Sequence, residues 1–300
     1  MLYLLSIEDY QKAGKVAAEV REDARKRYHV GETLLAVCEH VEGMIRARGA
    51  EPAFPCNVSL NEVAAHYTAE PNDEAVVKDD DVLKIDIGAH VNGYIADTAV
   101  TVCYNPKYDS LVNAAELALQ EAVKIVKAGV KASEIGKVVE HTTSRMGFKP
   151  IHNLSGHSLA QYTIHAGKSI PNIWTIGTFS LLPNQAYAIE PFLTTKDGSG
   201  IVYNGKIKNI FAIATRKRTG DKEADAFLDY LWNKFKTLPF ALRWVLKDYD
   251  EQRARKLLEL LIKKKLVKAY PILVEGNGKF VAQAEHSLIP TENGVMIITL

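Results

Sequence analysis

The sequence has few cysteines, no excess of either charge and no long apolar run, and each absence excludes a class of protein. Its three cysteines, at positions 38, 56 and 103, have no CxxC spacing, which argues against a disulfide framework or a zinc knuckle. The formal net charge of +1 marks the chain neither as a nucleic-acid binder nor as a membrane-surface binder. The first residues, MLYLLSIEDYQKAGK, contain too short an apolar run for a signal peptide or membrane span. We therefore expect a cytoplasmic protein that binds neither membrane nor DNA.

The sequence does contain four carboxylates and one histidine in short apolar, strand-like stretches. In chain order they are Asp86, Asp97, His157, Glu190 and Glu285. A buried ionised carboxylate is costly unless it is paired or coordinated, and no lysine or arginine directly adjoins these four. Two divalent cations would balance four carboxylates in formal charge, +4 against −4, and would leave the neutral imidazole as a nitrogen ligand. The pattern predicts a dinuclear metal site.

Helical and strand-like segments alternate along the chain. Apolar residues at helical spacing predict helices over 7–27, 32–48, 109–128 and 133–146, with Ser6 before the first and glycines after the others. Residues 52–70 should be irregular or short strand. Residues 184–192 should form a strand that carries Glu190 and ends near Pro191.

Residues 209–270 differ in character, because they become charged and helical. Their run of three lysines, 263–265, is most often a solvated helix face and only secondarily a patch for RNA or the ribosome. The strand pattern before this segment resumes after it. We therefore expect a main α/β domain formed by residues 1–208 and 271–300, with 209–270 as an inserted subdomain.

Residues 82–102 predict a β-hairpin, with β-branched residues on both sides of an Asn-Gly turn. A two-residue turn at this pair sets Gly88 opposite Asp97. Asp86 then lies diagonally from Asp97 on the same face, because positions two apart along a strand share a face. Gly88 would leave space beside Asp97 for a metal and its water.

Six segments resemble, in order and spacing, the type II methionine aminopeptidases. They are FPCNVSLNEVAAHYTAE, VLKIDIGAHVNGYIADTAVTV, LSGHSLAQYTIHAGKSIP, YAIEPF, TLPFALRW and AQAEHSLIPT. The short N-terminus, without a charged extension, and the IEPF segment are similar to the archaeal form. The resemblance implies the pita-bread (creatinase/aminopeptidase) fold, an α/β (α+β) architecture in which two pseudo-twofold halves surround a cleft. It also implies that 209–270 is the helical, winged-helix-like insertion of type II enzymes.

The same resemblance implies two divalent metal ions, and Co, Mn, Fe and Zn all accept oxygen-rich ligation. Asp86 would chelate one metal, and His157 and Glu190 the other. Asp97 and Glu285 would bridge both. The pair of cations would hold a water or hydroxide and lower its pKa, with Glu190 as general base.

Substrate-contacting residues follow from the resemblance as well. His66 and His165 would orient the scissile bond and stabilise the tetrahedral intermediate as catalytic residues. The apolar pocket for the first side chain would be lined by Phe54, Ile164, Phe192 and Tyr270. Two positions depart from the family pattern, because Asn57 replaces a small residue near the pocket and Ile210 stands where some members have another histidine.

The implied function is removal of the initiator methionine from nascent polypeptides when the second residue is small, with the ribosome nearby. An Xaa-Pro peptidase shares the fold and the five ligands, but the insertion and the HYT and TLPFALRW segments favour the methionine enzyme. A non-catalytic homologue that binds RNA or ribosomes is expected to lose metal ligands, and here all five remain.

Overall fold

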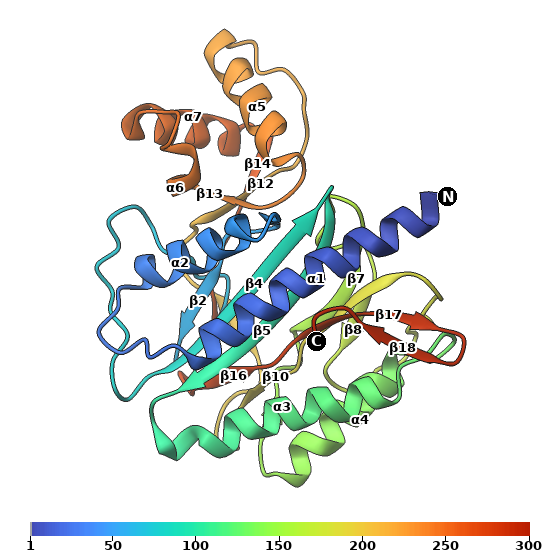
Figure 1. The fold of residues 1–300 in the computed structure, drawn as a ribbon. Coiled ribbons are helices and arrows are strands. Elements are labelled where there is room, and N and C mark those ends of the chain that lie inside the picture. Colours follow the sequence, from blue (N-terminus) through green and yellow to red (C-terminus); the bar gives the residue numbers. More distant parts are fainter. Residues whose placement is uncertain (1) are drawn as a thin grey trace.

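A computed structural model describes residues 2–300, and the side chains from residue 6 onward. Two hydrophobic clusters organise most of the chain, each between β-strands and a pair of helices (Figure 1). The first pair comprises α1 (Leu2–Lys26) and α2 (Leu34–Ala47), and the second α3 (Asp109–Lys124) and α4 (Ala132–Arg145), with the 3-10 helix η1 (Pro106–Tyr108) before α3. Within the described residues, no helix is both long and apolar enough to cross a membrane.

All four predicted helices are present, but the first two start more than one residue from the predicted position, and the third ends at Lys124 rather than at residue 128. The first helix begins at Leu2, so the predicted cap at Ser6 is wrong. The leucines before Ser6 are good helix formers and extend the helix. The second helix begins at Leu34, because the hydroxyl of Thr33 accepts a hydrogen bond from the backbone N–H of Ala36 and caps it there.

The predicted hairpin consists of β4 (Val82–Val91) and β5 (Tyr94–Cys103), joined by the Asn-Gly turn. Gly88 pairs with Asp97, as predicted. Asp86 precedes Gly88 by two residues, so both aspartates lie on one face of the sheet. Helix α1 crosses the opposite face of the hairpin (Figure 1), where alternating residues of the two strands join its hydrophobic cluster.

Short antiparallel strands complete the main part of the fold. The hairpin sheet also contains β1 (Glu51–Pro52) and β2 (Asn57–Leu60), which flank β4. A five-stranded sheet has the order β18 (Gly294–Ile297), β17 (His286–Thr291), β9 (Ala186–Ile189), β7 (Ser155–Leu159), β8 (Ser169–Pro171). One three-stranded sheet has the order β16 (Val281–Gln283), β10 (Phe192–Thr194), β6 (Lys149–Pro150). The other has the order β11 (Val202–Asn204), β15 (Leu273–Glu275), β3 (Val63–Ala65).

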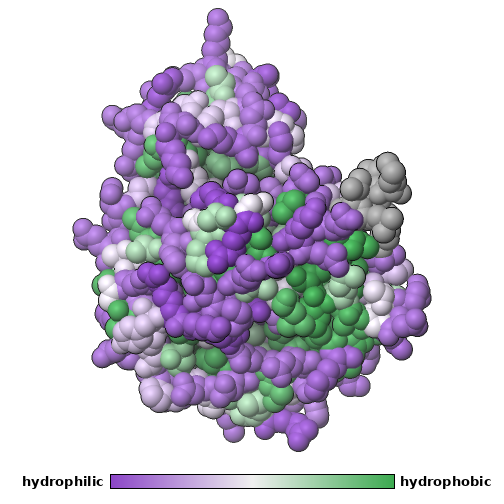
Figure 2. All heavy atoms as spheres, viewed as in Figure 1, coloured by the Kyte–Doolittle hydropathy of each residue, from purple (hydrophilic) through white to green (hydrophobic). Residues whose placement is uncertain are grey.

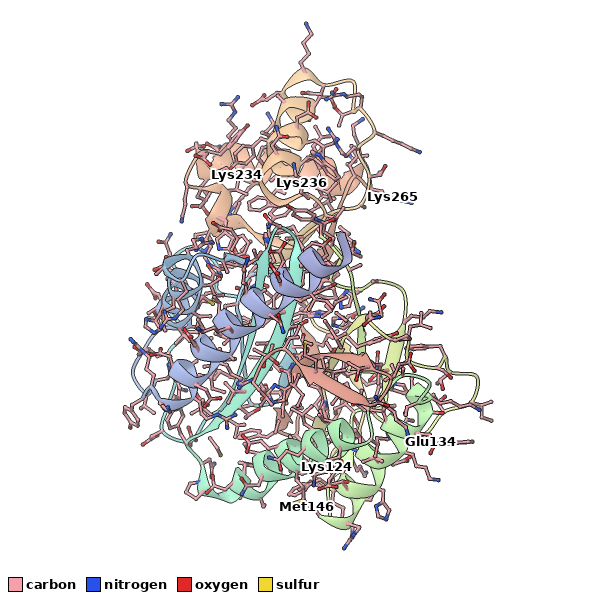
Figure 3. The ribbon with its side chains drawn as sticks, turned by 45° about the vertical axis from the view of Figure 1, so that its right-hand side comes forward. Lys124, Glu134, Met146, Lys234, Lys236 and Lys265 are labelled. Carbon is pink, nitrogen blue, oxygen red and sulfur yellow. The ribbon has the colours of Figure 1, made fainter. Side chains whose placement is uncertain are left out.

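Residues from Ile210 to Tyr270 form a separate lobe at the top of Figure 1. Its elements are β12 (Ile210–Ile213), α5 (Lys222–Phe235), β13 (Phe240–Ala241), α6 (Leu242–Val245), α7 (Glu251–Lys263) and β14 (Val267–Tyr270). A third hydrophobic cluster is built entirely from this segment. The face seen in Figure 2 is largely hydrophilic over the lobe, and Figure 3 labels Lys265, one of the three exposed lysines of the 263–265 run. The three strands were not predicted from the charged, helical sequence.

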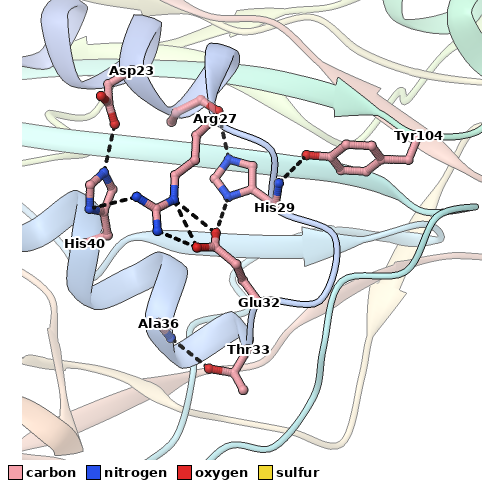
Figure 4. Close-up of polar contacts among 9 residues, drawn as sticks. Asp23, Arg27, His29, Glu32, Thr33, Ala36, His40 and Tyr104 are labelled. Carbon is pink, nitrogen blue, oxygen red and sulfur yellow. Dashed lines mark hydrogen bonds and ion pairs between the residues drawn. The ribbon is translucent and has the colours of Figure 1, made fainter.

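A polar cluster joins the end of α1 to α2 (Figure 4). The ring of His29, which is fully buried, lies with Nε2 2.8 Å from the carbonyl oxygen of Ala24 and Nδ1 2.9 Å from Glu32. Glu32 also pairs with Arg27, and His40 contacts Asp23. Neither histidine is a predicted ligand, and the contacts of both hold α1 and α2 together, so their role is structural.

One buried ion pair ties the lobe to the main domain. Glu42 of α2 is 2% exposed and pairs with the guanidinium of Arg243 in the lobe. Its second oxygen accepts from the indole N–H of Trp244 at 2.6 Å. Arg243 also donates to the hydroxyl of Thr68 and the carbonyl of Ala69, each at 2.9 Å. The pair therefore links three segments that are distant in sequence.

Glu42→Ala should lower the free energy of unfolding by about 3–5 kcal/mol, because it leaves a buried guanidinium without its anion. Urea unfolding followed by circular dichroism measures this change. The matched control is Glu39→Ala, an exposed position on the same helix, where we expect a change within about 0.5 kcal/mol. Equal effects of the two substitutions would contradict the anchoring role of Glu42.

Candidate metal centre

Three strands and two strand ends of the main domain bring the five predicted ligands to one point. Asp86 lies on β4, Asp97 on β5 and His157 on β7. Glu190 follows β9, and Glu285 precedes β17. The prediction that Glu190 lies within a strand is wrong, because β9 ends at Ile189 and β10 (Phe192–Thr194) begins only at Phe192. Glu190 is followed by a proline, which has no N–H for a strand ladder.

Measured distances show how closely these groups approach. Ligand atoms of Asp97, His157 and Glu285 all lie within 4.8 Å of one another. The Nε2 atom of His157 is 3.4 Å from Oε1 of Glu190 and 3.7 Å from Oδ2 of Asp97. Asp86 joins the group across Asp97, and these two carboxyl groups influence each other's protonation. The five side chains thus form a single cluster.

Burial and mutual repulsion make the carboxylates of this cluster hard to ionise without a cation. Burial raises the pKa of Asp86 to about 6. Burial raises the pKa of Asp97 well above its usual range, and the charge of Asp86 adds to the shift. The pKa values of Glu190 and Glu285 are raised in the same way, first by burial and then by the charge of Asp97.

The remaining atoms of the cluster fit a cation. Among the described residues, Oδ1 of Asp86, Oδ1 of Asp97 and Oε1 of Glu285 are buried and accept no hydrogen bond. Buried oxygens in this state require an explanation such as an ion. Burial, and then His165, lowers the pKa of His157 to about 3, so its imidazole is neutral and able to coordinate. Four carboxylates and a neutral imidazole are donors that divalent transition metals accept.

A cavity of about 380 Å³ opens over this cluster. Its wall contains all five predicted ligands, the histidines at 66 and 165, and the four residues predicted to line the substrate pocket, which are Phe54, Ile164, Phe192 and Tyr270. Asn57 and Ile210, which depart from the family pattern, also face it. Every site residue expected from the sequence therefore lies at one cavity.

His66 has an unusual backbone conformation. Its φ angle is 66°, a left-handed value that costs energy for a residue other than glycine and often marks a functional site. Its Nδ1 lies 3.3 Å from the carbonyl oxygen of Pro271, which can only accept, so Nδ1 carries the proton. Burial lowers the pKa of His66, and the neutral ring keeps Nε2 as an acceptor.

His165 lies at the exposed rim of the cavity, next to a predicted ligand. Its ring centroid is 4.4 Å from that of His157, in an edge-on arrangement. Desolvation by the surrounding protein, and then electrostatic repulsion by His66, lower the pKa of His165 to about 4. His66 and His165 are therefore both neutral near neutral pH, although His66 is partly buried and His165 is exposed to solvent.

Two details of the site differ from what the sequence indicated. Gly88 does not leave space for a metal, because a Cβ atom there would lie 2.2 Å from the ring of Phe54, which fills that position. Gln283 was missed, although its amide nitrogen lies 3.4 Å from Oδ2 of Asp86 and 3.2 Å from Oε2 of Glu285. Its spacing of two residues from Glu285 in a strand-like segment was the available signal.

Comparison with known proteins identifies the family. The model of metallopeptidase family M24 matches residues 8–213. A methionine aminopeptidase from Methanocaldococcus jannaschii is 45% identical over 298 residues, which cover 98% of this chain and 100% of the relative.

Solved structures show the same fold. A methionine aminopeptidase from Thermotoga maritima has a TM-score of 0.70 at 23% identity, covering 98% of this chain and 96% of that one. A thermophilic Arx1 has a TM-score of 0.81 at 17% identity, covering 98% and 90%. The expected pita-bread fold is thereby confirmed. The matched family model and the full-length relative agree with the motifs first seen in the sequence, and the chain belongs to metallopeptidase family M24.

Proposed function

We propose that the chain is a methionine aminopeptidase, a hydrolase that removes the N-terminal methionine of new polypeptides when the second residue is small. The observation that carries this proposal is one cavity in which a cluster of metal-binding groups adjoins two neutral histidines and an apolar wall. Similarity over the full chain to a relative named methionine aminopeptidase supports the same activity. Such a substrate is found in the cytoplasm near the ribosome, which we propose as the place of action.

Two divalent metal ions would be held by the five clustered ligands, with Asp97 and Glu285 shared between the ions. The unpaired buried oxygens of Asp86, Asp97 and Glu285 support this assignment. When bound, such ions supply Lewis acidity and ease the deprotonation of water. Co, Mn, Fe and Zn all suit these donors, and availability selects among them.

Three side chains would handle protons and orient the peptide bond. Glu190, at the cavity, would accept a proton from the attacking water and return it to the leaving amine. His165 is neutral, so its N–H would donate to the carbonyl oxygen of the scissile bond. His66 would accept a hydrogen bond from a substrate N–H through Nε2.

The apolar part of the cavity suits a methionine side chain. Phe54, Ile164 and Phe192 are each less than 10% exposed, so their surfaces exclude water from the pocket. An unbranched thioether adapts to such a wall without a polar partner. Tyr270 closes the pocket beside His66, with ring centroids 5.9 Å apart.

We also propose that residues 209–270 are an inserted subdomain that completes the pocket. Ile210, Pro239 and Tyr270 come from this lobe and line the cavity. Its separate hydrophobic cluster supports the boundary.

Peptides that begin Met-Ala should be hydrolysed at the first bond by the metal-loaded protein, while Ala-Pro peptides should not. The apolar wall recognises the first side chain, which is methionine in one peptide and alanine in the other. Release of methionine measured by mass spectrometry tests this expectation. Cleavage of Ala-Pro peptides alone would indicate an Xaa-Pro peptidase, and full metal loading with no cleavage would favour a non-catalytic homologue.

Asp97→Ala should reduce binding at both metal positions, because we assign this carboxylate to both ions. Calorimetric titration with Mn²⁺ should show about two equivalents for the unaltered protein and a loss of both high-affinity equivalents in the variant. Asp79→Ala, at an exposed site, is the control and should bind as the unaltered protein does. Retention of two tight equivalents by Asp97→Ala would refute the shared-ligand role.

His66→Ala should keep both metals but lower kcat by about 100-fold, since a positioned proton-transfer or hydrogen-bonding group contributes that much or more. Steady-state kinetics on a Met-Ala-Ser peptide, together with metal analysis, measures the two properties separately. His141→Ala, on the exposed side of α4, should leave both unchanged. Metal loss in the His66 variant, or an unchanged kcat, would show that its role is misassigned.

A further inference from the structure

Helix α1 contributes one buried arginine, Arg21, although the helix lies on the outside of the hairpin (Figure 1). The side chain of Arg21 is 6% exposed and does not line the active-site cavity. Arginine is almost never buried without partners for its five N–H donors. Its Nε pairs with Glu22 on the same helix at 3.0 Å, and two of its other partners, Thr98 and His286, belong to the chain segments that carry Asp97 and Glu285.

A single nitrogen of Arg21 contacts both of these segments and also the C-terminal residues of the chain. Its Nη1 donates to the hydroxyl of Thr98 at 2.8 Å and to the carbonyl oxygen of Thr299 at 2.8 Å. The same atom lies 3.0 Å from Nδ1 of His286, which must accept because a guanidinium has no acceptor, so one of the two hydrogens of Nη1 is shared between two acceptors. Thr98 follows Asp97 on β5, and His286 follows Glu285 at the start of β17.

One contact of Arg21 continues to the backbone of Glu285, and the segment that carries Glu285 contacts the backbone of Asp97. The hydroxyl of Thr98 accepts from Arg21 and donates onward to the carbonyl oxygen of Glu285 at 2.7 Å. On the other side, the hydroxyl of Ser287 donates to the carbonyl oxygen of Asp97 and accepts from its N–H, each at 2.8 Å.

Asp97 lies on β5, and Glu285 directly precedes β17, which belongs to a different sheet. A single isolated bridge, between Ala99 and Glu285, joins their backbones directly. Two carboxylates that repel each other across so short a ladder would tend to separate. A metal ion tolerates deviations of only about 0.2 Å in its ligand distances. The spacing of Asp97 and Glu285 therefore has to be fixed by contacts on the side of the sheet opposite the cavity.

We propose that Arg21 is a positioning residue of the metal centre, which fixes the spacing of Asp97 and Glu285 through Thr98 and the start of β17. This inference rests on the proposed metal-dependent function. Arg21 touches neither metal position nor substrate, and it acts through the hydrogen bonds described above. The alternative is that Arg21 only fastens α1 to the hairpin, which would affect stability and leave metal binding unchanged.

Mn²⁺ binding to metal-free protein separates these two roles. Calorimetric titration should give a dissociation constant for the second Mn²⁺ that rises about 10–100-fold in Arg21→Gln, the range typical for partners of metal ligands. The electron paramagnetic resonance signal of two coupled Mn²⁺ ions should weaken in parallel. Arg21→Lys, which keeps the charge, should recover part of the affinity. Each titration is made below the melting temperature of that variant.

Two further variants complete the test. Arg25→Gln is the matched control, because Arg25 lies on the same helix but pairs at the surface with Glu22 and Glu116, and it should bind Mn²⁺ as the unaltered protein does. Thr98→Val removes the hydroxyl that reaches Glu285 while retaining Arg21 and the side-chain shape. It should weaken the second Mn²⁺ in the same direction, and it decides the question if Arg21→Gln fails to fold.

The outcomes are distinguishable. If the unaltered protein binds no Mn²⁺ or other divalent ion, the proposed metal centre fails, and this inference fails with it. If the unaltered protein binds two ions and the folded Arg21→Gln and Thr98→Val variants bind both with unchanged affinity and coupling, only the role of Arg21 is overturned. A lower melting temperature with unchanged binding has the same meaning.

Discussion

Repulsion among four carboxylates in one cavity is the constraint on which the rest of this structure depends. Asp86, Asp97, Glu190 and Glu285 come from separate strands or strand ends, and burial raises the pKa of each. A group of this kind is unfavourable unless protons or cations compensate its charge. The surrounding structure therefore has to hold these oxygens together while leaving one side open for the compensating ions.

Three parts of the chain share this task. The hairpin of β4 and β5 holds two aspartates rigidly, because its register is set by a tight turn. The five-stranded sheet supplies His157 on β7, and Glu190 and Glu285 lie next to its strands β9 and β17. The lobe adds Ile210, Pro239 and Tyr270 to the cavity wall and is anchored by the buried pair of Glu42 and Arg243. Loosening any one part would alter the cavity without removing a ligand.

Features that depend on local chemistry could be predicted from the sequence. The Asn-Gly turn and the two-residue period of the strands predicted that Gly88 pairs with Asp97, and the structure has this pairing. Where a distant segment intervenes, the structure differs from the prediction. The ring of Phe54 occupies the space over Gly88, and nothing near Gly88 in the sequence could indicate that. The strands of the lobe were also missed, because tertiary packing overrides a charged, helix-like composition.

By itself, the sequence determined the ligand types, their order and the hairpin register, since donor chemistry and turn preference are properties of residues and their neighbours. Its motifs also identified the family. Tertiary structure alone decided which unpaired oxygens face one another, that a neutral His66 adopts a left-handed backbone, and that Arg21 of the first helix reaches the strands behind Asp97 and Glu285. The physical reason is that these contacts join residues tens to hundreds of positions apart, and their distances are set by the packing of whole elements.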